Sequence, residues 1–376
     1  MSEDPQLHVQ FLQRPTYAFL QTVGYGSQGK TELHLHELFE QRVVSKTISL
    51  LGVPGGIASS EPRLLKDIEH PRIVRVREAQ WAAGHDPSLK VVTFTTDFCE
   101  GLSVAAALDT GHRFSVSAAL RITADVLDAL DHLHNTHRIV HRDVKPGNVM
   151  LDGERSRGYL GDFGSAALLD ASGVVPAGGC TELYQAPESI VGSITTAADV
   201  YGAGMVALEL LHGAPNFDHL DHDKISKRLA EGRRALSDPY FAPMPWVPPA
   251  VASIVRAMTH KDPARRPTPA EALRLINRTS CVSWKRVEGT GLVGRWEGRW
   301  PPTVSRDRQR IYRVTSTPIE TGRYGGLLRL QAAWRAPSTT WKNYARFDRR
   351  IDPHDDTALA RMFRDVEAAP QSAPAR

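Results

Sequence analysis

The stretch IVHRDVKPGNVM, residues 139–150, constrains the fold more than any other part of the chain. Within six positions it brings together Asp143, Lys145 and Asn148, between flanks that are apolar on both sides. A proline and a glycine precede the asparagine and exclude a regular helix, so we predict a tight loop between two buried segments. Such a loop directs its polar side chains toward one place, which is how functional sites are usually built.

The composition limits the kind of protein that can carry this loop. A chain of 376 residues that is 41% hydrophobic has the composition of a soluble globular protein, with room for two or three domains. No apolar run approaches the ~18 residues that a membrane helix needs, and the polar start MSEDPQ is not a secretory signal. Cys99, Cys180 and Cys281 are too scattered for a zinc motif or a disulfide framework. We therefore expect a cytoplasmic protein with no membrane partner.

Residues 17–36 predict a β-hairpin whose turn is rich in glycine. The strand-like YAFLQTV runs into GYGSQG and is followed by the alternating TELHLH. Gly24, Gly26 and Gly29 would let the backbone approach a ligand closely, and a turn of free N–H groups can cover phosphates. The alternative is a hairpin that needs its glycines for the turn alone, because the pattern by itself has little specificity.

The next predicted strand contains an unexpected lysine. Residues 42–50 are rich in β-branched side chains but include Lys46, and a buried lysine is costly unless it is paired. The alternative is a strand edge at which the ammonium group is solvated. A short helix predicted from about 59 to 69, capped by one of its first two serines, offers Glu61 in its first turn as the partner.

These motifs and the ones that follow them resemble the eukaryotic-type (Hanks-type) protein kinases over residues 14–279. The resemblance rests on motifs that occur in the family's order: the glycine turn GYGSQG, VVSK ending at Lys46, Glu61, HRDVKPGN with Asp143, DFG beginning at Asp162, GCTELYQAPE ending at Glu188, DVYGAG beginning at Asp199, and DPARRPT with Arg266. One motif alone could arise by chance, whereas the whole set at these intervals is specific.

The resemblance implies an α+β, bilobal kinase fold, with a tail at 1–13, a β-rich N-lobe at 14–97 and a helical C-lobe at 98–279. The implied function is that of an ATP-dependent serine/threonine protein kinase, which transfers the γ-phosphate of ATP to protein hydroxyls and phosphorylates itself. Two alternatives are a catalytically silent signalling scaffold and a small-molecule phosphotransferase. Arginine outnumbers lysine 36 to 10, which is typical of a GC-rich, bacterial genome.

The catalytic roles that the resemblance implies fall on four charged residues. Asp143 would accept the proton of the substrate hydroxyl and orient it toward the γ-phosphate, and Lys145 would steady that phosphate. Lys46 would neutralise the α- and β-phosphates, aimed by Glu61. If these residues were only hydrogen-bonded polar groups of the core, they would not need their joint spacing along the chain. We therefore favour the functional interpretation.

The cofactors implied are ATP and Mg²⁺, with Mn²⁺ as an alternative metal. Asn148 and Asp162 would hold the metal, because hard cations prefer oxygen ligands. The other ATP contacts would come from apolar side chains around the base, from the hinge backbone and from the glycine turn: Val23, Val44 and Met150, then Asp97 and Cys99, then Gly24, Gly26 and Gly29.

Further residues bear on substrate class and on the lower lobe. A lysine two residues after the catalytic aspartate is typical of kinases that act on serine and threonine, and Thr181 would bond both of those groups. Glu188 would pair with Arg266, and Asp199 would anchor the lower lobe through its helix.

Regulation is suggested by Arg142, which precedes the catalytic aspartate. A phosphate on Ser172 would pair with Arg142 and order the activation loop, unless that loop is held by its own packing. Gln28 and Thr31 depart from the usual loop tip and the usual valine over the base, which would loosen ATP binding. If the helix that begins near Glu61 is short or displaced, its ion pair would be open at rest and would need an activator.

The last part of the chain, 280–376, is predicted to be a basic, tryptophan-rich accessory domain. Residues 278–376 carry 19 Lys and Arg against 10 Asp and Glu, and five of the seven tryptophans lie there. Strands are predicted at GRWEGRW, QRIYRVT and LLRLQAAWR, with a helix at 355–369. The tryptophans would form a core. The arginines are either a solvated face or a docking surface for an acidic partner or nucleic acid.

Overall fold

The computed structural model describes residues 16–26, 29–51, 61–178, 181–215, 217, 220–300 and 309–369. The tail expected at 1–13, the departure at Gln28 and the serines expected to cap the helix near 59 lie outside the described residues. Contacts divide the chain into two compact units, one formed by residues 1–68 and 74–98 and the other by residues 69–73 and 99–376.

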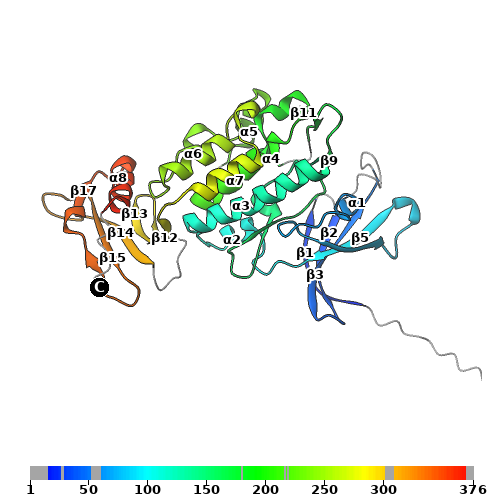
Figure 1. Ribbon diagram of the computed structural model, residues 1–376, viewed down its shortest axis with the longest axis horizontal. Coiled ribbons are helices and arrows are strands. Elements are labelled where there is room, and N and C mark those ends of the chain that lie inside the picture. The colour runs from blue at the N-terminus through cyan, green and yellow to red at the C-terminus, as the bar shows by residue number, and fades with distance from the viewer. Residues whose placement is uncertain are drawn as a thin grey trace, which may run out of the picture. The chain divides into compact units, whose positions relative to one another are not determined.

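The first unit is built on an antiparallel sheet of strands in the order β1-β2-β3-β5-β4 (Figure 1). These strands are β1 Tyr17–Gly26, β2 Gly29–His36, β3 Gln41–Ser49, β4 Val76–Trp81 and β5 Val91–Asp97. Alternating side chains of β3 and β5 point to one face, where Ile48, Leu50, Val92 and Phe94 form a buried cluster. The glycine-rich hairpin and the lysine-bearing strand are therefore both present.

The helix expected at about 59–69 is shorter than that prediction. α1 spans Glu61–Leu65, and the Ile68 N–H then donates to the Leu65 carbonyl oxygen at 3.1 Å in a turn that ends the helix. Leu65 and Ile68 are both buried, so the apolar spacing identified buried positions correctly but not the path of the backbone. A helix this short is unstable in isolation and depends on its tertiary contacts.

The helical part of the second unit is arranged around α4, Ala197–His212, which is buried from Asp199 to Leu211. A helix that is apolar on all sides is expected at the centre of a core. The other helices of this part are α2 Val104–Asp109, α3 Val116–His132, α5 His222–Ala230, α6 Pro249–Met258 and α7 Pro269–Arg278. Both α3 and α6 pack against α4, and α7 packs against α3.

Short two-stranded ribbons connect these helices and shape the loops between them. β6 Ile139–Val140 pairs with β9 Ala167–Leu168, β7 Val149–Leu151 pairs with β8 Gly158–Leu160, and β10 Val175–Pro176 pairs with β11 Ser193–Ile194. The predicted loop at 141–148 lies between β6 and β7, so it is held at both ends by strand pairing.

A second antiparallel sheet follows the helices, in the order β12-β13-β14-β15-β16, and β17 also pairs with β15. Its elements are β12 Ser283–Thr290, β13 Val293–Trp300, β14 Arg310–Pro318, β15 Leu328–Arg335, β16 Lys342–Asn343, β17 Arg349–Ile351 and the helix α8 Asp356–Glu367. The helix stripe Leu359, Met362, Phe363 and Val366 is buried as predicted. β12 was not predicted, because its sequence SWKRVEGT is too polar to suggest a strand.

The sheet contacts the helical part of the same unit through two clusters. Ser283 Oγ donates to Ser117 Oγ at 2.6 Å, at the start of α3. The rings of Trp246 and Trp296 lie 5.7 Å apart, and the Arg286 guanidinium lies 4.8 Å from the first ring centroid and 5.0 Å from the second. The division of the chain at 279 into separate domains stays a prediction.

The described helices were also compared with the requirements for crossing a lipid bilayer. None of them has both the length and the apolar character that a membrane span requires.

Candidate active site

The first unit pairs Lys46 of β3 with Glu61 of α1. Lys46 Nζ lies 2.7 Å from Glu61 Oε2, and the two side chains are only 16% and 4% exposed. In the sheet register Lys46 lies between Thr31 of β2 and Phe94 of β5, so the ammonium group emerges from a central strand rather than a strand edge. The short α1 therefore does not open this ion pair, contrary to the expectation for a short helix.

The glycine turn has a structural requirement at its far end. A Cβ atom on Gly29 would lie 1.9 Å from the Thr47 carbonyl oxygen, so only glycine lets β2 approach β3 at this point. Gly24 has open space around its Cα, and Gly26 pairs with Gly29 at the end of the hairpin. Gly29 is therefore required for the close packing of β2 on β3, whereas Gly24 leaves the backbone accessible.

The first unit holds three of the residues expected around the ATP base on its strands, Val23, Val44 and Asp97, and the second unit holds Met150. Val23 is 56% exposed on β1, and Val44 of β3 lies opposite Thr96 of β5. The Asp97 N–H donates to the Arg75 carbonyl oxygen at 3.2 Å, and the contact between the Asp97 carbonyl and a base stays a prediction. In the second unit, Met150 is half-buried on β7.

Cys99 begins the second unit's main segment. Its carbonyl oxygen accepts the Leu102 N–H at 3.1 Å, which closes a tight turn after the strand. The Cys99 carbonyl is therefore used in this turn, and the contact between its N–H and a base stays a prediction.

Asp199 of α4 holds the start of the loop at 141–148. Its carboxylate accepts hydrogen bonds from the backbone N–H groups of His141 and Arg142, each at 2.8 Å, and from His134 Nε2 at 2.8 Å. Burial alone would raise the pKa of Asp199, but the His134 hydrogen bond and the neighbouring histidines hold it below its ordinary value. The carboxylate therefore stays charged and fixes the backbone that precedes Asp143.

Donors surround the Asp143 carboxylate, which is itself nearly buried. Lys145 Nζ donates to Oδ2 at 2.7 Å and Asn148 Nδ2 donates to the same oxygen at 3.1 Å. The backbone N–H of Thr181 donates to Oδ1 at 3.2 Å. Lys145 Nζ also donates to Thr181 Oγ1 at 2.8 Å, so Thr181 bonds the lysine through its hydroxyl and the aspartate through its backbone.

Asn148 and Asp162 are brought together by the β7–β8 ribbon. Val149 pairs with Leu160, and the Gly161 N–H donates to the Asn148 carbonyl oxygen at 2.9 Å, which places Asp162 one residue beyond this bond. Asp162 has a φ of +58° and is exposed. Left-handed backbone at a non-glycine residue is strained, and such strain gathers at functional sites.

The donor set at this point suits a hard cation. The Asn148 amide nitrogen is used on Asp143, which leaves the amide oxygen for a metal, and Asp162 supplies a carboxylate. Within the described ranges no three His, Cys, Asp or Glu side chains form a metal cluster. A cation here would therefore need further oxygens, such as those of a nucleotide's phosphates.

Arg142 contacts the backbone of the segment 165–176, which follows the DFG motif. Its φ is +68°, its Nε donates to the Ser165 carbonyl oxygen, and its Nη1 donates to the Pro176 carbonyl oxygen at 3.0 Å. Ser172 Oγ donates to Asp170 Oδ1 at 2.7 Å, where a phosphate would meet a carboxylate. The pairing of phosphorylated Ser172 with Arg142 stays a prediction.

Two more pairs stabilise the second unit near the site. Glu188 and Arg266 form a two-pronged ion pair, with both N···O distances at 2.7 Å, and the arginine side chain is fully buried.

Glu209 of α4 is also buried. It lies next to Tyr184, which is the third residue after Thr181. Burial chiefly raises the pKa of Glu209, to about 7, against the opposing hydrogen bond of Tyr184. Glu209 had no predicted role, although a lone carboxylate in an apolar run is the signal that marks it in the sequence.

Comparison with known proteins agrees with this geometry. A family model described as the protein kinase domain matches residues 17–275. The serine/threonine-protein kinase Nek3 of Oryza sativa subsp. japonica is 27% identical over 265 residues, which are 69% of this chain and 43% of that protein. The chain thus spans less than half the length of this relative. Because the family model covers well over half of the sequence, the chain belongs to the family of protein kinase domains.

Proposed function

We propose that the chain is a serine/threonine protein kinase that uses ATP and Mg²⁺. The observation that carries the proposal is the Asp143 carboxylate, which Lys145, Asn148 and the Thr181 N–H hold in place. A charged carboxylate fixed by three donors is suited to accept a hydroxyl proton and to orient that hydroxyl. The similarity to a serine/threonine-protein kinase supports the same substrate class.

The other roles follow from where the charges lie. Lys46, buried and aimed by Glu61, would bind phosphate oxygens. Lys145 would neutralise charge on the transferred group. Asn148 and Asp162 would hold Mg²⁺, which would supply charge stabilisation at the phosphates. Phosphoryl transfer mainly requires a protein to position the reactants and to stabilise charge, so no further catalytic group is required.

The test is transfer of labelled γ-phosphate from ATP in Mg²⁺ by the full chain, with and without dephosphorylated casein. We expect Asp143→Asn to lower the rate by roughly 10²- to 10⁴-fold, and to leave the circular dichroism spectrum unchanged. Glu154→Gln is the matched control, because Glu154 is exposed in the turn between β7 and β8. We expect phosphoserine or phosphothreonine in the products, including the chain itself.

Other outcomes would identify the alternatives. Transfer to small molecules but to no protein would indicate a small-molecule phosphotransferase. No transfer by the folded wild-type chain to any acceptor would indicate a silent scaffold. An Asp143→Asn variant as active as the wild type would show that this carboxylate has no catalytic role.

A further inference from the structure

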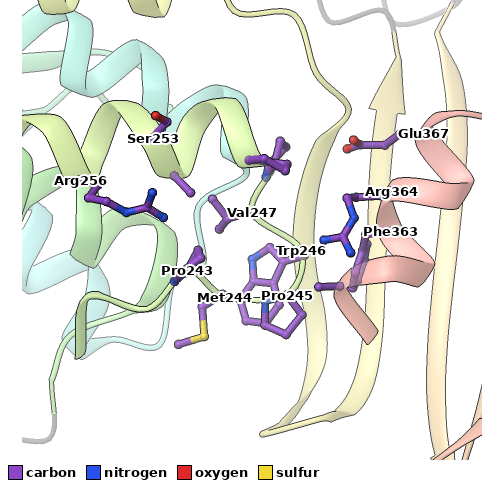
Figure 2. Close-up of a pocket in the computed structure, with 14 residues that line it drawn as sticks. Pro243, Met244, Pro245, Trp246, Val247, Ser253, Arg256, Phe363, Arg364 and Glu367 are labelled. Atoms are coloured by element: carbon purple, nitrogen blue, oxygen red, sulfur yellow. The ribbon is translucent and has the colours of Figure 1, made fainter. Parts of the chain in front are cut away.

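A cavity of about 310 Å³ lies between the segment that leads into α6 and the terminal helix α8 (Figure 2). Its apolar wall includes Met244, Trp246 and Phe363. Trp246 packs against Trp296, with ring centroids 5.7 Å apart. The cavity volume falls at the lower end of the range of small-molecule sites, which are mostly apolar with a few polar groups.

Two arginines approach this cavity from opposite sides. Figure 2 shows Arg256 reaching in from α6 and Arg364 from α8, with both guanidinium groups directed toward the space between the helices. Neither side chain has a hydrogen bond or an ion pair with any residue that the structure describes. Both residues are exposed, so water rather than a carboxylate of the protein stabilises their positive charges.

The third charged group of the lining is engaged elsewhere. Glu367 Oε1 accepts the Trp284 indole N–H at 2.8 Å, so the sheet holds this carboxylate. Burial raises the pKa of Glu367 against the opposing Trp284 hydrogen bond, and at a pH high enough to ionise it the formal charge of the lining is one positive unit. One carboxylate neutralises that charge, whereas a phosphate dianion exceeds it and faces Glu367 as well.

We propose that this cavity binds a small aromatic carboxylic acid. The ring would pack on Trp246, Met244 and Phe363, where it loses contact with water. The carboxylate would accept hydrogen bonds from Arg256 and Arg364, whose planar donor groups match its geometry. Such a ligand joins α6 of the helical part to α8 of the terminal sheet. The site shares no residue with the proposed phosphotransfer machinery.

The experiment uses the full chain and radiolabelled indole-3-acetate in equilibrium dialysis. We expect saturable binding at one site, and a loss of at least tenfold in affinity for Arg256→Gln and for Arg364→Gln, since a charge-assisted hydrogen bond contributes on this order. Arg361→Gln is the matched control on the outer side of α8. Neutral indole-3-acetamide is expected to compete at least tenfold more weakly, and phenyl phosphate more weakly as well.

A variant that fills the cavity separates binding from folding. Ala360 lines the cavity, so we expect Ala360→Phe to abolish binding and to keep the thermal midpoint of the wild type. The proposal is overturned if indole-3-acetate shows no saturable binding to the wild type. It is also overturned if the arginine variants bind as tightly as the wild type, or if the neutral amide binds equally well. None of these results bears on kinase activity.

Discussion

At the scale of single residues, environment gives each carboxylate its own behaviour. Asp143 is surrounded by donors, and Asp199 is kept charged by His134 and by backbone N–H groups. Glu209 is buried with far weaker support, and its pKa is raised to about 7. Identical chemical groups therefore behave as a carboxylate held by three donors, as a charged anchor for backbone N–H groups, and as a group that is neutral in mildly acidic solution.

The buried Glu209 contributes stability that falls as the pH rises from about 5 to 8, whereas the buried His212, whose pKa is lowered to about 4, contributes stability that rises in the lower part of this range. The pKa of Glu209 in the folded chain, about 7, exceeds the ordinary 4.5, so the folded state keeps a proton that the unfolded state releases. The Glu209 contribution to the free energy of unfolding should drop by up to about 3 kcal/mol across this window and then level off. Urea unfolding of the wild type and of Glu209→Gln at both pH values measures this contribution as a difference, because the histidine contributions are common to the two chains.

The stability that Asp199 contributes depends on pH with the opposite sign, so the contributions of the two groups can be separated. Its lowered pKa gives stability that is complete above the ordinary value of a carboxyl and is lost only at strongly acidic pH. Equal pH dependence in the wild type and in Glu209→Gln, between pH 5 and 8, would contradict the assignment to Glu209.

At the scale of elements, α4 sets the position of the loop at 141–148. Asp199 bonds the loop backbone, and Gly202, one turn later, lets the helix approach the loop closely. A Cβ atom on Gly202 would lie 2.5 Å from the Val144 carbonyl oxygen, next to Asp143. α4 thus holds the loop through the Asp199 carboxylate and through the close approach that Gly202 allows.

Gly202→Ala should push the loop and α4 apart. Overpacking of this kind costs about 1–3 kcal/mol of stability, and a displacement of Asp143 by a fraction of an ångström to 1 Å should lower kcat by up to roughly 10²-fold. Kinase assays and thermal unfolding measure both effects. Gly153→Ala is the control, because its Cβ meets only Glu100 Cβ at 3.4 Å. Unchanged kcat in a folded Gly202→Ala variant would show that this contact does not position Asp143.

At the scale of the whole molecule, the terminal sheet and the helical part of the second unit share buried aromatic groups. Trp246 belongs to the helical part and is 6% exposed, while Trp296 of the sheet is fully buried. Arg286 lies against both rings. The match to the kinase family ends at residue 275, so this contact joins the family's domain to a region beyond it.

Removing residues 280–376 should therefore destabilise what remains. The truncated chain would expose Trp246, and burial of a large aromatic side chain contributes about 2–3 kcal/mol, so we expect the thermal midpoint to fall by about 5 °C or more. Light scattering should show aggregation, which Trp246→Ser in the truncated chain should reduce. A truncated chain with the midpoint of the full chain would support a separate domain that begins near 280.

The family and most of the site could be predicted from the sequence, because the residues concerned occur in short local motifs. HRDVKPGN places Asp143, Lys145 and Asn148 in one loop by chain connectivity alone, and sequence patterns identified several strands of each sheet, although not β12. The stripe on α8 followed from helical periodicity. These features depend on neighbours a few positions apart, which is the range over which a sequence pattern carries physical information.

The tertiary structure alone decided how distant segments meet. It formed the Lys46–Glu61 pair on an α1 that ends earlier than its apolar spacing suggested, and it brought the Thr181 N–H to Asp143 across 38 positions. It also buried Glu209 and set Arg286 between two tryptophans. Burial and pairing are properties of the whole packed core, where each group's energy depends on neighbours that no local pattern specifies.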